Sequence, residues 1–291
     1  MHARLKGVGQ TAVSAPGLGV RKARRTGKPA PSALEDKLGR SPSPSTPPAR
    51  ISCVVCAYNE ADRIRSILDA VDHHPALAEV IVVNDGSTDD TLALLRGYPD
   101  IRVISYAPNR GKTYALSRGI AAARGDYLML LDADLAGITP ADIQALADPV
   151  ISGRAQVSIS LRRNSLPLYR WIGLDFVSGE RVIPARLIGD AVEAMGRLPR
   201  WGGEPCINDV IIRGRLPIEV VDWPTVSNIR KYRKLGRWRG MVAELEMVGD
   251  TLRILSPWGV LRQNLALLKL AKRGVSKNGR ARASAARRTA P

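Results

Sequence analysis

The first half of the chain repeats one unit: a short apolar run, a polar loop, and a segment whose apolar residues recur at helical spacing. Units of this kind begin at residues 51–56, 80–83 and 101–105, and a fourth apolar run covers 127–131. Short apolar runs bounded by turn residues are typical of strands buried in parallel sheets. Alternating strands and helices with short connections indicate a doubly wound, mostly parallel sheet. We therefore expect an α/β domain with further helices toward the C-terminus.

A polar loop follows each predicted strand. Ligands of doubly wound sheets bind beyond the carboxyl ends of the strands, so these loops are expected to share one edge. Gly and Asp in the second loop predict a turn, and Ser87 or Thr88 is expected to cap the next helix. The loops read AYNE (57–60), NDGSTD (84–89), NRGK (109–112) and LDAD (131–134).

The last loop carries two carboxylates, Asp132 and Asp134, where an apolar strand leaves the core. Carboxylates at positions i and i+2 of a strand end point the same way. Such a pair can hold Mg²⁺ or Mn²⁺, whose remaining ligands are usually substrate phosphates and water. Asp is also common in ordinary turns, so the pair alone does not identify a metal site and must be considered together with the other loops.

Taken together and in this order, the four loops resemble the nucleotide-sugar half of family 2 glycosyltransferases with the GT-A fold. The resemblance implies a Rossmann-like sheet, transfer of a sugar from a nucleotide diphosphate sugar, a catalytic metal at Asp134 and Asp132, and a donor site built from all four loops. The implied donor-site residues are Ala57, Tyr58, Asn59, Glu60, Asp85, Gly86, Lys112, Asp132 and Ala133. The Gly-rich fingerprints of dinucleotide enzymes and P-loop NTPases are absent from the sequence.

In the second half, residues 157–161 predict another strand, and the segment 178–181 (SGER) is similar to one in polyisoprenyl-phosphate glycosyltransferases of the dolichyl-phosphate mannose synthase type. That similarity implies a polyprenyl phosphate acceptor at the cytoplasmic membrane face, with Arg181 contacting its phosphate through paired donors. The alternative is a structural role for Arg181, as a salt-bridge partner of Glu180 or of a helix end.

Two acidic residues, Glu204 and Asp209, lie in a segment that resembles the acceptor region of the same enzymes. Glu204 follows two glycines and precedes a proline, so it is expected at a helix entrance, where it could also serve the helix dipole. Asp209 is expected inside that helix. An alcohol acceptor needs one of them as a base, whereas a lipid phosphate is already ionised near neutral pH. The sequence leaves the choice between the two residues open.

The only dense basic cluster between the chain's two ends covers residues 228–239. It includes Arg230, Lys231 and Arg233, for which we expect contacts with a diphosphate, a lipid phosphate or anionic headgroups. A solvated, charged helix face is the alternative interpretation.

The net charge of +17 comes from the two ends of the chain: residues 1–50 hold 10 basic and 2 acidic residues, and 262–291 hold 9 basic and none acidic. Composition predicts a disordered basic segment over 1–49, a catalytic domain over 50–256 (donor half 50–136, acceptor half 137–256), an amphipathic basic helix over 257–273 and a disordered tail over 274–291. An anionic membrane surface is the expected partner, although the helix could instead pack on the domain. Specific nucleic-acid binding is not expected, because no recognition motif is found.

Other features indicate the compartment and the competing functions. Cys53 and Cys56 are predicted to point to opposite faces of one strand, which excludes a disulfide between them and favours a reducing, cytoplasmic location. The longest apolar stretches fall short of a membrane span. Two alternatives stay open: transfer to a soluble sugar or a phosphorylated small acid, and a nucleotidyltransferase that uses the same metal chemistry.

Overall fold

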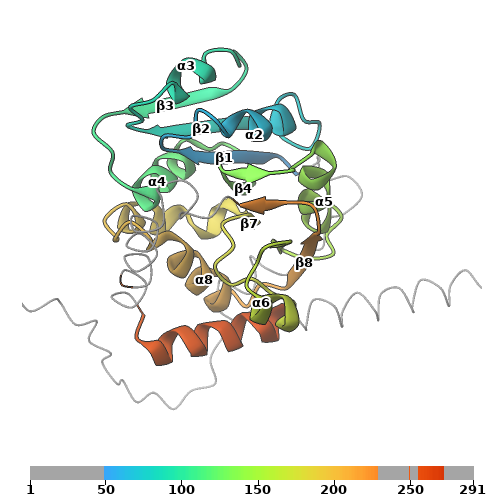
Figure 1. Cartoon of the computed structure of the whole chain (residues 1–291). Coiled ribbons are helices and arrows are strands. Elements are labelled where there is room, and N and C mark those ends of the chain that lie inside the picture. The colour runs from blue at the N-terminus through green and yellow to red at the C-terminus, as the bar shows by residue number, and fades with distance from the viewer. Residues whose placement is uncertain (1–48, 229–248, 250–254, 272–291) are drawn as a thin grey trace, which may run out of the picture. The chain divides into compact units, whose positions relative to one another are not determined.

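A computed structural model of the chain describes residues 49–228, 249 and 255–271. All of them belong to the larger of two compact units, Pro44–Pro291. Their central sheet has seven strands (Figure 1). In spatial order these are β3 (Arg102–Tyr106), β2 (Glu79–Asp85), β1 (Ile51–Ala57), β4 (Tyr127–Asp132), β7 (Arg181–Pro184), β6 (Val157–Arg162) and β8 (Ile218–Trp223). Two short strands, β5 (Leu135–Ala136) and β9 (Ser227–Asn228), pair separately.

The sheet is mostly parallel, as the sequence predicts, and its four N-terminal strands run in one direction. One strand differs from the fully parallel order that alternating units suggest. β7 runs antiparallel to both of its neighbours, β4 and β6. Two reversals restore the original direction, so β6 and its parallel partner β8 point the same way as β4. The carboxyl end of β6 therefore lies at the same edge as Asp132.

The helices cover both faces of the sheet. Inward residues of β1 pack on one face with α2 (Ile64–Val71) and α5 (Pro140–Ile151). On the other face α4 (Lys112–Ala122) approaches β1 closely: a Cβ on Gly119 would lie 2.3 Å from a methyl group of Val54. Glycine is therefore the residue that allows this helix to reach the sheet. Further α-helices in the described residues are α3 (Thr91–Leu95), α6 (Pro167–Ile172), α7 (Val192–Met195), α8 (Gly203–Arg213) and a C-terminal helix over residues 257–271.

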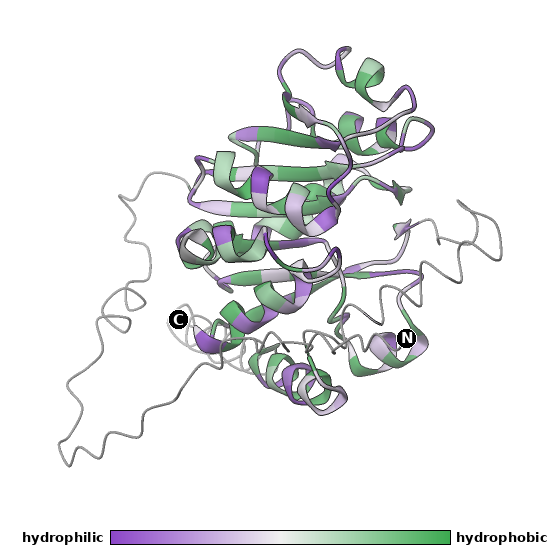
Figure 2. Cartoon of the chain, turned by 90° about the vertical axis from the view of Figure 1, so that its left-hand side faces the viewer, coloured by the Kyte–Doolittle hydropathy of each residue, from purple (hydrophilic) through white to green (hydrophobic). Residues whose placement is uncertain are grey.

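Hydrophobic residues dominate the strands, whose side chains form the core (Figure 2). Cys53 packs in the α2/α5 layer and Cys56 against the opposite layer, and both are free thiols, as predicted. The prediction that Ser87 or Thr88 caps α3 is wrong, since Asp89 accepts a hydrogen bond from the Thr91 amide instead. No helix in the described part of the chain combines the length and apolar character needed to cross a bilayer.

Candidate active site

The loops singled out in the sequence meet at the carboxyl edge of the sheet, where β1, β2 and β4 end at Ala57, Asp85 and Asp132. The first two loops are tied to each other. The Asn59 amide donates to Ser87 Oγ (3.0 Å), and the Thr88 amide donates to Asn59 Oδ1 (2.8 Å). Ala57 is buried at the strand end, whereas 42% of Tyr58 is exposed. Tyr58 is therefore the side chain of this loop that is open to a ligand.

Asp85 is buried and holds the third loop in place. Its carboxylate accepts hydrogen bonds from the Asn109 side chain, the Arg110 amide and the Gly111 amide, each at 2.8 Å. Gly86 brings the backbones together, since a Cβ there would lie 2.6 Å from the Asn109 nitrogen. Asp85 thus shapes the loop that leads to Lys112. A direct contact of Asp85 or Gly86 with a donor stays a prediction.

The ammonium of Lys112, the first residue of α4, bridges two carboxylates. Its Nζ lies 2.7 Å from Asp132 Oδ1 and 2.7 Å from Glu204 Oε1. Burial disfavours the charged amine, but the two carboxylates outweigh burial and raise the pKa of Lys112 above its ordinary value. Lys112 therefore stays protonated at neutral pH and joins the donor half of the domain to its acceptor half.

Thr113 fixes the position of Glu204. The Thr113 hydroxyl accepts hydrogen bonds from the Gly202 and Gly203 amides (3.0 Å each) and donates to the Arg200 carbonyl (2.7 Å). These amides open α8, and amides at a helix start have no partner within the helix. The first turns of α4 and α8 are thus joined through one buried side chain, and Glu204 in α8 faces Lys112 in α4.

Asp209, the second acidic candidate, lies elsewhere. It is five positions beyond Glu204 in α8, about half of its side chain is exposed, and its Oδ2 lies 2.6 Å from Arg213 Nη2. A small pocket at the end of β4 is lined by Lys112, Asp132 and Glu204, and Asp209 takes no part in it. Of the two residues that the sequence left open, the structure brings Glu204 to the site. A role for Asp209 at the acceptor stays a prediction.

The segment before β7 passes directly over Asp132. A Cβ on Gly179 would lie 2.7 Å from Asp132 Oδ1, so glycine is needed for this approach. Arg181, two residues on, also lines the pocket but is fully buried. It donates to Asn208 Oδ1 at 2.8 Å and to the Ser178 carbonyl. Burial lowers the pKa of Arg181. These two hydrogen bonds are structural, although with Asn208 and not with Glu180 as partner, and a contact of Arg181 with an acceptor phosphate stays a prediction.

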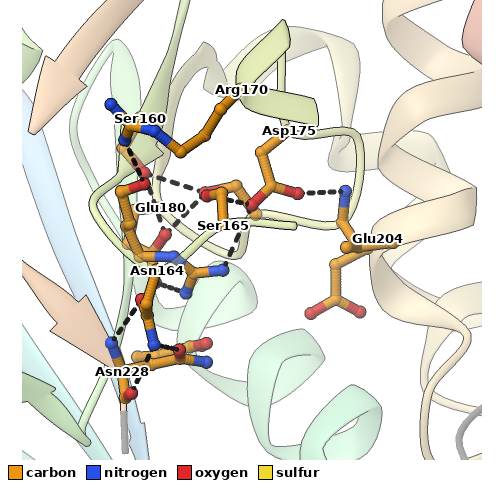
Figure 3. A network of polar contacts seen from close by, with 12 residues as sticks. Ser160, Asn164, Ser165, Arg170, Asp175, Glu180, Glu204 and Asn228 are labelled. Carbon is orange, nitrogen blue, oxygen red and sulfur yellow. Dashed lines mark hydrogen bonds and ion pairs between the residues drawn. The ribbon is translucent and has the colours of Figure 1, made fainter. Parts of the chain in front are cut away.

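A buried polar network supports this segment and was not predicted (Figure 3). Glu180 accepts hydrogen bonds from Ser160, Ser178 and Arg162, the last at 2.9 Å. Arg162 lies 3.4 Å from Asp175, which in turn accepts from Ser165 (2.6 Å). Burial raises the pKa of Glu180, and Arg162 opposes that shift. The Glu204 side chain points away from this network. The only hint in the sequence is the charged Arg162 that ends an apolar strand.

Of the predicted metal ligands, Asp132 is the last residue of β4 and about one-fifth exposed, and Asp134 follows two positions later. Within the described residues no group of three or more His, Cys, Asp or Glu side chains could hold a metal ion. Two carboxylates still suit Mg²⁺ or Mn²⁺, because these ions take their other ligands from substrate phosphates and water. Ala133 is buried between the two acids. The predicted phosphate contacts Arg230, Lys231 and Arg233 lie outside the described residues.

The domain resembles known proteins in sequence. Residues 52–181 match the model of glycosyl transferase family 2. A dolichyl-phosphate beta-glucosyltransferase of Trichomonas vaginalis is 31% identical over 150 residues, which cover 42% of this chain and 44% of that protein. The succinoglycan biosynthesis protein ExoO of Rhizobium meliloti is 37% identical over 112 residues, 38% of this chain and 32% of that protein. The chain thus spans less than half the length of these curated relatives.

Solved structures extend the similarity into the second half of the chain. Glucosyl-3-phosphoglycerate synthase from Mycobacterium tuberculosis, in complex with Mn²⁺, uridine diphosphate and glucosyl-3-phosphoglycerate, superposes with a TM-score of 0.56 at 25% identity. The match covers 79% of this chain and 86% of that one. The four loops, the sheet order and these matches lead to one conclusion: residues 52–181 are similar to glycosyl transferase family 2, and the chain has the GT-A fold.

Proposed function

We propose that the chain transfers a sugar from a nucleotide diphosphate sugar to a phosphorylated acceptor, preferably a polyprenyl phosphate at the cytoplasmic face of a membrane. One observation carries the proposal. The Lys112 ammonium lies 2.7 Å from Asp132, at the predicted donor side, and 2.7 Å from Glu204, at the predicted acceptor side. A protonated amine between the two half-sites is well placed to stabilise charge that develops on a diphosphate leaving group.

The cofactor of this reaction is proposed to be Mg²⁺ or Mn²⁺, held by Asp134 and Asp132. When bound, the cation neutralises charge on the leaving diphosphate. The described residues supply hard oxygen donors at the carboxyl edge of the sheet, as such ions require. The similar synthase from Mycobacterium tuberculosis was solved with Mn²⁺ and uridine diphosphate, which supports a divalent cation here.

The chain's own residues have separable roles in the proposed reaction. Tyr58 offers an exposed ring to the base, and Lys112 exchanges its contact with Asp132 for one with the diphosphate. The acceptor oxygen attacks the anomeric carbon as the bond to the diphosphate breaks. Glu204 accepts the acceptor's proton if the acceptor is an alcohol, whereas an ionised phosphate nucleophile requires no base.

Two acceptor classes receive support from different observations. Trp258, Leu261 and Leu265 of the C-terminal helix are 45–65% exposed, which favours a lipid acceptor reached from a membrane surface. Leu267 and Leu270 of this helix are buried, and Gln263 joins it to α8 through the Asn208 side chain and the Pro205 carbonyl. The structural match to a synthase that uses phosphoglycerate favours a phosphorylated small acid. The family similarity gives no support to a nucleotidyltransferase.

A two-stage experiment tests the proposal. Nucleotide sugars are first screened for thermal stabilisation of the full chain with and without Mn²⁺, since ligands that bind the native state raise its apparent stability. The stabilising donor is then incubated with a short-chain polyprenyl phosphate or with 3-phosphoglycerate, and products are identified by mass spectrometry. Glycosylated polyprenyl phosphate is the expected product. Glycosylated phosphoglycerate would select the second acceptor class, and stabilisation by no nucleotide sugar would refute the proposal.

A further inference from the structure

A short segment at the active-site edge presents large apolar side chains to solvent. Trp171 is 85% exposed, Leu168 58%, and Leu166 and Val177 52% each. Three of the four lie in or next to α6, in which no residue is buried. Soluble proteins seldom leave apolar groups of this size clustered on the surface unless the cluster binds something.

This exposure is built into a well-anchored segment. Phe176 and Leu174 point inward and are buried, and the ring of Phe176 meets that of Tyr169 edge to face at 5.5 Å. Asp175 is held by Ser165 at 2.6 Å, and Arg170 donates to the Arg162 carbonyl at 2.9 Å. The inward side chains fix the backbone, so the outward apolar side chains are presented in a defined arrangement.

The position of the segment ties it to the active site. β6 runs in the same direction as β4, so the chain leaves β6 at the edge where Asp132 lies. At the far end of the segment, Val177 lies two residues before Gly179. The Cα of Gly179 faces the Asp132 carboxylate. A surface that binds residues 166–177 is therefore brought next to the acceptor side of the pocket.

A second exposed apolar face lies close by, on the C-terminal helix. The side-chain amide of Asn208, in α8, donates to the Phe176 carbonyl (3.1 Å) and to Gln263 Oε1 (3.2 Å). Gln263 belongs to the helix that exposes Trp258, Leu261 and Leu265. One buried side chain thus links the two elements. Figure 1 shows α6 beside this helix at the lower end of the domain.

The charges around these apolar groups are basic. The exposed charged residues of segments 163–178 and 257–271 are Arg163, Arg170, Arg262 and Lys269. The one acid in the two segments, Asp175, is buried. Outside the two segments, the exposed Asp222 forms an ion pair with Arg170 at 3.9 Å, so among the described residues Arg163, Arg262 and Lys269 supply the unopposed positive charge of this surface. Exposed Trp and Leu side chains surrounded by cations complement an anionic lipid surface, where the rings and aliphatic groups enter the interface and the cations meet headgroups.

We propose that residues 166–177 dock on an anionic lipid bilayer together with the exposed face of helix 257–271. The α6 segment is the part of this surface nearest to the pocket, so docking sets the acceptor side against the headgroup layer. That consequence for the acceptor rests on the function proposed above, whereas the docking itself does not.

Vesicle binding of the full chain tests the docking. The double variant Leu168→Ser/Trp171→Ser is compared with Ile151→Ser, which changes a side chain of 40% exposure at the end of α5, on the opposite edge of the sheet. With vesicles of phosphatidylcholine and phosphatidylglycerol in equal parts, the double variant is expected to bind at least about tenfold more weakly, because two apolar side chains no longer enter the interface. The Ile151→Ser variant is expected to bind these vesicles like the parent. Vesicles of pure phosphatidylcholine are expected to bind the parent and both variants poorly.

Further measurements distinguish lipid docking from misfolding and from self-association. Trp171→Phe keeps an apolar ring, so it is expected to retain vesicle binding but to lose part of the fluorescence quenching by brominated lipid. Equal midpoints of thermal unfolding and equal stabilisation by donor show that the double variant is folded. Unchanged vesicle binding by that variant would overturn the proposal. The proposal would also be overturned if the double variant lost self-association in sedimentation velocity but kept vesicle binding. The apolar surface would then bind a second copy of the chain and not a lipid bilayer. Docking without transfer to a lipid phosphate would refute only the proposed acceptor.

Discussion

The Nζ of Lys112 lies 2.7 Å from Oε1 of Glu204, although the two residues are 92 positions apart in the sequence. One begins the helix that follows the third loop, and the other lies in the first turn of α8. Their contact places the cation expected to serve the leaving group next to the carboxylate expected to serve the acceptor. We therefore expect departure of one substrate fragment and approach of the other to be coupled through this ammonium.

Replacing Lys112 by Met, which has similar length and no charge, is expected to lower kcat/KM by roughly 100-fold or more, because the diphosphate loses a preorganised cation. Lys112→Arg is not expected to restore activity, since a planar guanidinium cannot take the place of a compact ammonium between two carboxylates. Steady-state kinetics with saturating Mn²⁺ provide the measurement. Parent-like kcat in Lys112→Met would remove Lys112 from the mechanism.

The pKa of Lys112 gives the parent enzyme a pH signature. Because Asp132 and Glu204 raise that pKa above its ordinary value of 10.5, the ammonium persists at least up to that pH. Stability from this ion triplet is then fully present below pH 10.5 and lost only as pH rises through the higher folded-state pKa. The rate profile should show no alkaline limb from Lys112 below pH 10.5. A limb near pH 9 that is absent in Lys112→Met would contradict this expectation.

Asp134→Asn is expected to abolish most turnover while leaving the midpoint of thermal unfolding unchanged, because a carboxylate ligand is removed at the carboxyl edge of the sheet and not in the core. EDTA should do the same to the parent. The additional readout is the thermal shift produced by Mn²⁺ with nucleoside diphosphate, which the variant should lose. Full transfer activity in EDTA would exclude the metal role of both Asp134 and Asp132.

Glu204 and Asp209 distinguish the acceptor classes. With a polyprenyl phosphate, Glu204→Gln should retain appreciable turnover at neutral pH, because the attacking oxygen is already anionic. With an alcohol acceptor, the same variant should lose roughly 100-fold or more while binding donor normally. Asp209→Asn is the matched control, since Asp209 pairs with Arg213 on the surface of the same helix. If Asp209→Asn loses activity and Glu204→Gln does not, Asp209 and not Glu204 serves the acceptor.

Gly179→Ala tests the close approach above Asp132. The new methyl group would lie 2.7 Å from the Asp132 carboxylate, so either the carboxylate or the segment must shift. We expect a clear loss of donor-dependent thermal stabilisation and of turnover. Gly189→Ala adds the same methyl group at a site with no atom within 4 Å and should behave like the parent. Equal thermal stabilisation and equal turnover in the two variants would show that the close approach of Gly179 to Asp132 does not affect function.

The donor side of the site was predictable because parallel strands bring their carboxyl ends to one edge, so four loops found in order had to meet. The proximity of Lys112 and Asp132 followed from that rule, whereas their proposed roles came from the family resemblance. The direction of β7 did not, since a four-residue strand buried on both faces has the same pattern in either direction. The choice of Glu204 over Asp209 depended on how α8 docks, to which the Thr113 hydroxyl and the Asn208 side chain both contribute hydrogen bonds. The Arg162–Glu180 pair was hidden because Arg162 ends β6, whereas Glu180 lies 18 positions later in the irregular segment before β7.

The contacts of Thr113 determine how this domain can be recombined with its relatives. Because its hydroxyl binds the Arg200 carbonyl and the Gly202 and Gly203 amides, the start of α4 and the start of α8 form one structural part. In a chimera that joins a foreign acceptor half after residue 136, the start of α4 and the start of α8 would come from different proteins. Chimeras that transfer residues 109–113 together with 200–204 should keep the two helix starts matched, and we expect acceptor preference to be transferred only when both segments move together.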